Sequence, residues 1–332
     1  MKISTTVVIP NWNGLSYLKE CLASLKEQTR PFKLLVVDNG SDDGSAEYLS
    51  GSEFLEEYPH AKALLLSKNT GFCHAVNLGV RYADTDYIFL LNNDTLVDKE
   101  CLEKLEDAAK NAPKAFGVQA LMLNAKGDRI DSAGDLYCAL GWAYSGGKGK
   151  PYLKGKKGEG RTERVFSACG GAMLCRRKLF LKLGGFDEAH FAYLEDLDLC
   201  YRANIRGYRN YICPEALVLH AGSASTGTRH NPFKVFHAAR NNILLLAKNM
   251  PPLQILLNAP LLLAGGVVKY LYFTTKGLGK YYSRGVRAGF RMSAGRRQRN
   301  KHVTFEIRNI PQYIGIQADL WYNMLALFVT LL

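Results

Sequence analysis

Residues 33–45 read KLLVVDNGSDDGS, an apolar run that passes directly into a polar loop of aspartate, asparagine, serine and glycine. A short run rich in Val and Leu is typical of a buried strand. Three similar runs lie at residues 6–9, 63–67 and 87–91, and segments with helical periodicity separate them. This alternation over residues 1–222 predicts an α/β fold with a mostly parallel, Rossmann-like sheet flanked by helices.

Polar clusters follow several of these predicted strands, at residues 38–45, 69–71 and 92–94. Ligands of open α/β sheets bind beyond the carboxyl ends of the strands, so the clusters predict a polar-ligand site at that edge. The glycine motif of dinucleotide-binding proteins and the P-loop are both missing from the sequence. The Gly- and Lys-rich run from Gly146 to Gly160 lacks a preceding strand, and we expect a flexible loop there.

The composition is that of a globular protein of one large domain with an appendage, or of two ordinary domains. The 332 residues are 47% hydrophobic and 22% charged, which excludes a disordered or collagen-like chain. The net charge of +13 indicates an anionic partner. Most of it lies at residues 276–308, where ten Lys and Arg face a single acid, Glu306.

The basic segment lies between two apolar stretches, residues 251–275 and 320–332. We expect neither to span a membrane, because Pro260 and Gly265-Gly266 interrupt the first and the second is shorter than the ~20 residues required. Apolar anchors beside Lys and Arg predict attachment to an anionic membrane surface. The alternative is a helical subdomain with a solvated basic face. Nucleic-acid binding is not expected, because no groove-reading motif accompanies the charge.

These patterns divide the chain into a catalytic or binding domain, residues 1–250, and a helical, basic C-terminal extension, residues 251–332. The eight cysteines are scattered without a C-x-x-C pair, so we expect reduced thiols in a cytosolic protein. Residues 1–10 have neither the charged region nor the cleavage site of a signal peptide.

Eight motifs, in this order along the chain, resemble those of glycosyltransferase family 2. They are Val7 to Gly14, Val36 to Ser45, Asn69 to Phe72, Leu90 to Asp94, Gly170 to Leu174, Gly184 to Glu188, Glu195 to Leu199, and His220. The resemblance covers roughly residues 4–250 and is greatest to the rhamnosyltransferase-like branch. It implies a GT-A fold and transfer of a sugar from a nucleotide diphosphate-sugar to an acceptor hydroxyl, with inversion.

For the donor nucleotide, the resemblance implies contacts from the ends of the strands and the loops after them. The residues concerned are Pro10, Asn11, Asp38, Asn69, Gly71, Asn92 and Asn93. Asp38 matches the carboxylate that accepts hydrogen bonds from the base or the ribose, and a charged acceptor strengthens such bonds. Asp43 is left open between a ligand contact and a turn that closes residues 41–44.

For the metal, the resemblance implies Asp94 and His220 as ligands of Mg²⁺ or Mn²⁺, ions that favour oxygen donors and bridge the diphosphate. Asn92 stands where other members carry a first aspartate, so coordination by residue 92 is in doubt. For the leaving diphosphate, we expect Arg229 or His230 to contribute, unless the segment is an ordinary exposed loop.

For the acceptor, the resemblance implies that Asp196 is the general base, with Glu195 as the alternative. Both open a predicted helix, whose N-terminus stabilises carboxylates. Asp198 and Arg202 are spaced i, i+4 and are predicted to form a surface ion pair. Gly170 and Gly171 match the segment that lies against donor sugar and acceptor, and Trp142 is expected to shape the acceptor cleft or else to belong to the core.

The sequence therefore predicts a metal-dependent inverting glycosyltransferase, cytoplasmic and peripherally bound to the cell membrane. Its donor would be dTDP-rhamnose or a UDP-hexose, and its acceptor a lipid-linked or polysaccharide chain in cell-surface polysaccharide assembly. Two other classes stay open: a non-catalytic module that binds nucleotide-sugar or membrane, and a nucleotidyltransferase.

Overall fold

A computed structural model describes residues 3–153, 160–222, 230–295 and 302–331. The strands are β1 (Thr5–Asn11), β2 (Lys33–Asp38), β3 (Lys62–Leu65), β4 (Tyr87–Leu91), β5 (Thr95–Val97), β6 (Ala115–Asn124), β7 (Ile130–Ser132), β8 (Asp135–Cys138), β9 (Trp142–Ser145), β10 (Glu163–Val165), β11 (Ala172–Arg176) and β12 (Arg209–His220). The helices are α1 (Leu15–Leu25), α2 (Ser45–Ser50), α3 (Ser52–Glu57), α4 (Phe72–Tyr82), α5 (Cys101–Asn111), α6 (Arg177–Lys182), α7 (Glu195–Ile205), α8 (Pro232–Asn249), α9 (Pro252–Thr275), α10 (Gly279–Ala294) and α12 (Ile310–Leu331), with short 3₁₀ turns at Glu188–His190 and Ile307–Asn309.

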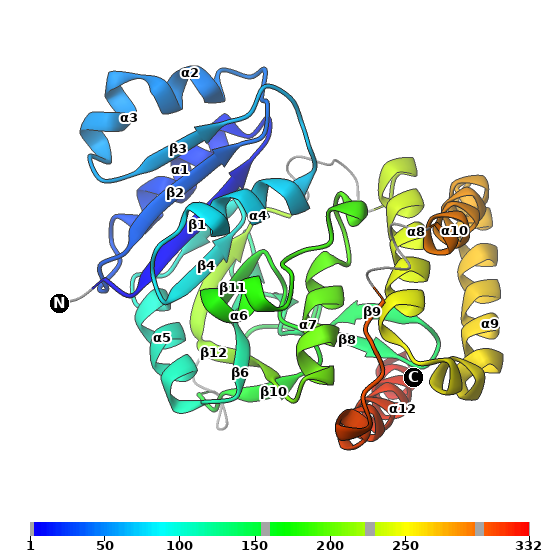
Figure 1. The fold of residues 1–332 in the computed structure, drawn as a ribbon. Coiled ribbons are helices and arrows are strands. Elements are labelled where there is room, and N and C mark those ends of the chain that lie inside the picture. Colours follow the sequence, from blue (N-terminus) through cyan, green and yellow to red (C-terminus); the bar gives the residue numbers. More distant parts are fainter. Residues whose placement is uncertain (1–2, 154–159, 223–229, 296–301, 332) are drawn as a thin grey trace.

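One large sheet, in the order β10-β12-β6-β11-β4-β1-β2-β3, forms the centre of the molecule (Figure 1). Strands β4, β1, β2 and β3 run parallel, as do β6 and β12, whereas β11 runs antiparallel between β4 and β6. Helices cover both faces. The predicted α/β fold is confirmed, and the four predicted strands of its N-terminal half all form.

The two faces of β1 show why the sheet needs both helical layers. Val7 and Ile9 pack into a core with α1 and α5, whereas Val8 packs into a second core with α4, α6 and α7. Successive side chains of a strand point to opposite faces, so an unbroken apolar strand must be covered on both. All three side chains are fully buried.

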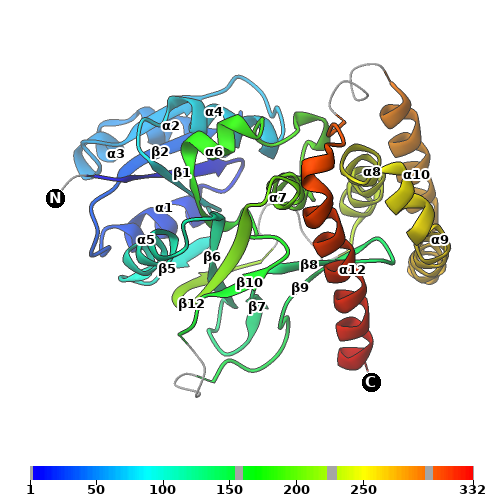
Figure 2. The same cartoon turned by 60° about the horizontal axis from the view of Figure 1, so that its bottom comes forward.

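Helices α8, α9 and α10 stack beside the sheet (Figure 1), and α12 crosses β8 and α7 (Figure 2). The contact between α10 and α8 depends on two glycines. A Cβ added to Gly285 would lie 2.4 Å from the Phe236 carbonyl oxygen, and one added to Gly289 would lie 2.6 Å from that of Arg240. Only glycine permits so close an approach of the two backbones.

Two features of this region could not be read from the apolar stretches alone. The stretch at residues 251–275 is not interrupted: α9 is one helix of 24 residues that continues through Pro260. Residues 320–331 of the second apolar stretch belong to the 22-residue α12, which Tyr313 and Leu320 anchor in the core. Among the described helices, α9 alone is long and apolar enough to cross a membrane. The eight cysteines are free thiols, and all but Cys169 are buried.

Candidate active site

A cavity of about 950 Å³ opens at the carboxyl edge of the sheet, between the strand ends, the segment before α7 and the start of α8. It collects predicted residues that lie far apart in the sequence. Those that line it are Pro10, Asn11, Asn69, Asn92, Asn93, Asp94, Gly171, Glu195, Asp196 and His220. The predicted polar-ligand edge is therefore a cavity, and the roles assigned to its individual residues stay predictions.

Strand pairing produces this convergence. Asn11 and Asp38 are partners in the parallel β1–β2 ladder, so the ends of the two strands meet. His220 pairs with Thr95 across the antiparallel β5–β12 ladder, which places it next to Asp94. Gly171 accepts a 2.9 Å hydrogen bond from the backbone N–H of Asn92 at the end of β4.

The residues predicted to bind the nucleotide form a network of side-chain hydrogen bonds. The side-chain Nδ2 of Asn11 donates to Asp38 Oδ1 at 2.9 Å, and Asn93 Nδ2 donates to Asn11 Oδ1 at 2.7 Å. Asp38 is fully buried and also accepts hydrogen bonds from the backbone N–H and hydroxyl of Ser41. It lies behind the cavity wall and orients Asn11, which lines the cavity.

The second part of this network joins the loops after β2 and β3. Asn39 donates to Asn69 Oδ1 at 3.0 Å, and the same oxygen accepts the N–H of Gly71. Gly71 has φ +94 and lies under Phe191, where an added Cβ would approach the ring to 2.6 Å, so glycine is required there. Asp43 accepts hydrogen bonds from the N–H groups of Leu15 and Ser45, an arrangement that fastens the loop.

Asp94 and His220 form the acid–imidazole pair expected for a metal site. His220 Nε2 lies 3.3 Å from Asp94 Oδ1, and His220 Nδ1 lies 2.8 Å from Asp131 Oδ2. Burial alone would lower the pKa of His220, but the carboxylates of Asp131 and Asp94 outweigh it and raise that pKa to about 9. The imidazole therefore lies between two acids.

The donor set of this pair fits a divalent ion. It offers a carboxylate oxygen and an imidazole nitrogen at the cavity wall, and Asp131 holds the other ring nitrogen as carboxylates do for metal-bound histidines. Another group with metal-ligand spacing in the described part of the chain consists of Asp135, Cys169 and Asp196, whose ligand atoms lie within 4.8 Å of one another. Burial raises the pKa of the Cys169 thiol, and a protonated thiol does not ligate a hard cation.

Asp196 begins α7 and faces the cavity. Its Oδ2 accepts a 2.9 Å hydrogen bond from the N–H of Gly170, and its Oδ1 accepts one from Leu197. Burial raises the pKa of Asp196, although these hydrogen bonds oppose the increase. Burial and the neighbouring Asp196 raise the pKa of Glu195 more strongly, and its Oε2 is buried without a partner among the described residues. Gly170 supports the carboxylate from behind the cavity wall.

The segment before α7 has an unusual backbone. Phe191, Tyr193 and Leu194 all have positive φ, at 62°, 73° and 65°. Bulky residues avoid this region at a cost of about 1–3 kcal/mol each, so the surrounding structure must enforce it. The Asn241 side chain, fully buried on α8, donates to the carbonyls of His190, Ala192 and Tyr193. Arg240 donates to the carbonyl of Ala189 and shares that of His190 with Asn241.

Two predicted residues lie elsewhere. Trp142 is at the start of β9, outside the cavity lining, where its indole Nε1 donates to the carbonyl of Gly265 on α9 at 3.0 Å. His230 contacts Tyr272 and Phe273 near the end of α9. Arg229, and residues 154–159 of the predicted Gly146–Gly160 loop, lie outside the described residues.

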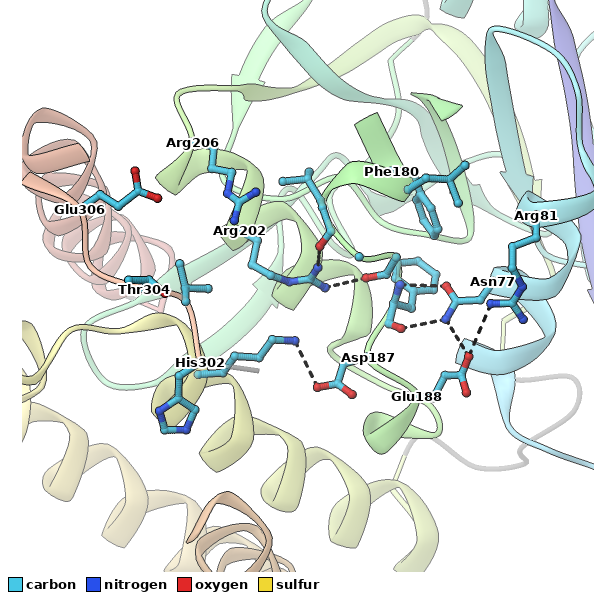
Figure 3. Close-up of a pocket in the computed structure, with 17 residues that line it drawn as sticks. Asn77, Arg81, Phe180, Asp187, Glu188, Arg202, Arg206, His302, Thr304 and Glu306 are labelled. Carbon is cyan, nitrogen blue, oxygen red and sulfur yellow. Dashed lines mark hydrogen bonds and ion pairs between the residues drawn. The ribbon is translucent and has the colours of Figure 1, made fainter. Parts of the chain in front are cut away.

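A second cavity, of about 590 Å³, lies between α4, α6, α7, α8 and residues 302–306 (Figure 3). It borders a buried charge network that corrects one prediction: Asp198 and Arg202 pair at 2.7 Å but are not on the surface. Lys248 of α8 joins them, 2.9 Å from Asp198 and 3.2 Å from Asp187. This lysine, 46 positions along the chain from Arg202, converts a local helix pair into a buried network.

Sequence reasoning missed several residues of the main cavity. Asp135 lines the cavity and Asp131 binds His220 from behind it; both come from the segment around β7 and β8, where the pattern IDSAGD of residues 130–135 was the available signal. An aromatic wall was also missed. It is formed by Trp12, Phe72, Phe191, Tyr193 and Phe233.

Comparison with known proteins identifies the family. The family model described as Glycosyl transferase family 2 matches residues 6–184. An N-acetylglucosaminyl-diphospho-decaprenol L-rhamnosyltransferase of Mycobacterium tuberculosis (strain ATCC 25618 / H37Rv) is 30% identical over 241 residues, 67% of this chain and 77% of that protein. Rhamnosyltransferase WbbL of Escherichia coli (strain K12) is 25% identical over 232 residues, 64% of this chain and 82% of that protein.

Solved structures agree on the fold. The crystal structure of GalNAc-T7 with UDP, GalNAc and Mn²⁺ superposes with a TM-score of 0.59 at 16% identity, over 74% of this chain but about half, 47%, of that one. The mannosyltransferase PcManGT from Pyrobaculum calidifontis, in complex with GDP-Man and Mn²⁺, superposes with a TM-score of 0.54 at 18% identity, over 96% of this chain and 85% of that one.

The fold is of the GT-A type. The chain belongs to glycosyltransferase family 2, in its rhamnosyltransferase-like branch, and is a glycosyltransferase.

Proposed function

We propose that this protein transfers a sugar, with rhamnose as the first candidate, from a nucleotide diphosphate-sugar to a hydroxyl of a lipid-linked acceptor, with inversion, in cell-surface polysaccharide assembly. One observation carries the proposal. Asp94, Asp196 and His220, separated by up to 126 positions, line the same cavity as the amide-rich ends of β1 and β4. The names of the mycobacterial and E. coli relatives support rhamnose, and the mycobacterial name supports a lipid diphosphate acceptor.

Asp196 acts as the general base of this reaction. It accepts the acceptor proton while the acceptor oxygen attacks the anomeric carbon and the bond to the diphosphate oxygen breaks. A single displacement of this kind inverts the anomeric centre. Gly170 and Leu197 hold the two oxygens of Asp196 by hydrogen bonds and fix the direction in which the carboxylate faces. Burial raises its proton affinity, which strengthens the base.

Asp94 and His220 hold a divalent cation, Mg²⁺ or Mn²⁺, in this proposal. When bound, such an ion supplies positive charge that stabilises the departing diphosphate. His220 would coordinate the ion as a neutral imidazole, and Asp131 keeps its ring oriented. The Mn²⁺-bound neighbours of the same fold support this assignment.

The nucleotide binds at the ends of β1, β2 and β4 in this proposal. Pro10, Asn11 and Asn69 present backbone and amide groups to it at the cavity wall. Asp38 acts from behind, because its carboxylate is occupied by Asn11 and Ser41. Gly171, whose small size leaves room beside Asn92, lies against the donor sugar.

Residues 251–332 attach the enzyme to the cytoplasmic face of the cell membrane, and residues 1–250 form the transferase domain. One stripe of α9 is fixed to the body: Gln254 and Asn258 are buried against α12, and Gly265 lies against Leu140. The opposite side is exposed and apolar, with Leu253 at 78% exposure. A helix fastened along one side and apolar on the other suits the membrane interface better than a span.

Basic side chains lie beside this apolar surface. Lys280, Arg284, Arg287 and Arg291 of α10 are exposed. Each attracts an anionic lipid surface by ~1 kcal/mol. The contact of His230 with Tyr272 brings the end of α9 close to Asn231 and Pro232, which line the cavity. This arrangement would hold the cavity near an acceptor anchored in the bilayer.

A donor panel tests the proposal. Purified full-length protein would be incubated with Mn²⁺, N-acetylglucosamine linked to polyprenyl diphosphate, and dTDP-rhamnose, UDP-hexoses or GDP-mannose in turn. We expect release of nucleoside diphosphate and an inverted product by NMR, strongest with dTDP-rhamnose. Asp196→Asn should lower kcat about 10²–10⁴-fold.

Asp107→Asn, which removes a half-exposed carboxylate on α5, is the matched control and should leave kcat unchanged. Wild-type protein that binds donors but releases no nucleoside diphosphate would identify a non-catalytic binding module. Formation of a nucleotide-sugar and pyrophosphate from a nucleoside triphosphate and a sugar 1-phosphate, in a parallel reaction, would instead identify a nucleotidyltransferase.

A further inference from the structure

Asp135 places a second aspartate carboxylate beside the proposed base. It is the first residue of β8 and lines the main cavity together with Asp196. Ligand atoms of Asp135 and Asp196 lie within 4.8 Å of each other. Asp135 belongs to none of the eight family motifs, because it lies between the fourth motif and the fifth.

The structure holds the Asp135 side chain firmly. Ser145 Oγ donates to Asp135 Oδ1 at 2.7 Å, and Ser132 Oγ approaches the same oxygen at 3.4 Å. Its backbone exchanges hydrogen bonds with Ser167 in both directions, at 2.8 and 2.9 Å. A carboxylate fixed in this way cannot swing away from Asp196 when charge repulsion arises.

The groups around Asp135 do not neutralise it. From α7 it faces Asp196 and Glu195, both acids, and between β10 and β11 it faces the Cys169 thiol, which burial keeps protonated. The charge of Lys148, beyond β9, opposes the rise in the pKa of Asp135, but this lysine is bound to Asp131 at 2.6 Å. Helix α12, packed on β8, carries one charge in its described side chains, Asp319, which is paired with Arg164.

Two nearby, half-buried carboxylates without a dedicated cation do not both ionise readily, so the pair retains one proton over a wide pH range. Burial and the charge of Asp196 raise the pKa of Asp135 to about 7. Glu195 adds a third acid, with an oxygen buried and unpartnered among the described residues. The local field therefore favours protons at this end of the cavity.

We propose that Asp135 is a positioning residue for the general base: it shares a proton with Asp196 and sets the proton affinity of that carboxylate. The proposal rests on the proposed function. In the transfer step, the acceptor proton goes to Asp196, the new bond joins the acceptor oxygen to the anomeric carbon, and the diphosphate leaves with the electrons of the broken bond. Asp135 exchanges no atom in this step and acts through its charge.

Asp135→Asn tests the proposal, because it keeps the shape and removes the charge. We expect the wild-type pair to titrate in two steps, and the variant in one step at lower pH than the upper wild-type step. Carboxyl ¹³C NMR of Asp-labelled full-length protein measures these steps without requiring activity, and Asp196→Asn assigns the signals. In the pH profile of kcat/KM for the acceptor, the rising limb should move to lower pH, with a plateau about 10-fold lower.

The controls separate folding from proton affinity. Asp135→Glu, which restores a carboxylate, should recover the two-step titration, and the donor KM should change little in either variant. If Asp135→Asn does not fold, Ser145→Ala is used instead. It removes a hydrogen bond to the charged form and should raise the upper step.

The outcomes are distinguishable. Wild-type protein without transfer activity but with the two-step titration would refute the proposed function and leave the carboxylate pair established. An active wild-type protein whose Asp196 signal and pH profile do not move in Asp135→Asn would overturn the role of Asp135.

Discussion

At the scale of single residues, the acids in and directly behind the cavity differ in protonation because of what lies next to them. Asp94 and Asp131 flank one imidazole, whereas Asp135, Glu195 and Asp196 crowd together without a dedicated cation. The first group is arranged to bind positive charge, and the second to retain protons. Charge pairing and burial, rather than residue type, distinguish these two ends of the cavity.

Asp131→Asn should weaken metal binding. Asp131 holds the ring nitrogen of His220 that faces away from the proposed ion, and loss of such a partner costs 10–100-fold in metal affinity. Mn²⁺ titration followed by electron paramagnetic resonance measures the affinity directly. Asp128→Asn, an exposed acid in the turn before β7, is the control and should bind Mn²⁺ like wild type. An unchanged Mn²⁺ affinity in Asp131→Asn would remove His220 or Asp131 from the site.

At the scale of elements, α8 holds the segment that presents the proposed base. The left-handed residues 191, 193 and 194 are stable because Asn241 and Arg240 bind the carbonyls of that loop. The start of α8 also lines the cavity. One helix therefore supports both the wall of the cavity and the backbone that leads to Asp196.

Asn241→Ala should lower kcat about 10²-fold, since a displacement of about 1 Å at a reacting group can cost that much. The donor KM should change little, because the nucleotide is proposed to bind at the ends of β1, β2 and β4, away from Asn241. Steady-state kinetics measure both. Asn242→Ala, the next residue, removes one hydrogen bond from Tyr137 and serves as a matched control for stability. Equal loss of kcat in both variants would contradict the assignment.

The network between α7 and α8 should make the fold sensitive to acid. Burial alone would raise the pKa of Asp198, but Arg202 and Lys248 outweigh it and hold that pKa well below its usual range. A carboxyl whose pKa is lower in the folded state stabilises the fold above its unfolded pKa of ~3.9. This contribution is lost as the pH falls further toward the folded pKa.

Asp198→Asn should therefore lower the free energy of unfolding by about 3 kcal/mol at pH 7, since it leaves buried cations undercompensated. The difference from wild type should shrink below about pH 4. Urea denaturation across this pH range measures it. Asp84→Asn, which breaks an exposed pair with Lys33, should change stability by about 1 kcal/mol or less. A pH-independent difference for Asp198→Asn would contradict the ionic account.

At the scale of the whole molecule, the C-terminal helices contribute to the buried core and also form the proposed membrane-binding surface. Tyr313, Ile316 and Leu320 of α12 are buried in a core shared with α7 and α8. Deletion of residues 276–332 would therefore expose that core and is a poor test of membrane attachment. Substitutions on the exposed face of α10 leave the packing glycines Gly285 and Gly289 in place.

The triple variant Arg284→Gln, Arg287→Gln and Arg291→Gln should weaken binding to vesicles that contain anionic lipid by about 100-fold, at ~1 kcal/mol for each cation. Co-sedimentation at fixed ionic strength measures this. Glutamine in place of Lys62, Lys99 and Lys114, exposed cations of the transferase body, removes the same charge and should have little effect. Equal losses in the two triple variants would indicate nonspecific charge attraction instead of a docking face.

The sequence alone determined the four strands of the N-terminal half, their ends and the motif residues, because strand periodicity and turn chemistry are local properties of the chain. It also indicated Asp94, Asp196 and His220, since a family motif is a short string. What only the tertiary structure decided depends on distant partners: the burial of Asp198 by Lys248, the packing of Trp142 against α9, the continuity of α9 through Pro260, and the meeting of Asp135 with Asp196. Burial and charge at Trp142, Asp198 and Asp135 are set by residues 50 to 123 places away in sequence, and no local pattern encodes them.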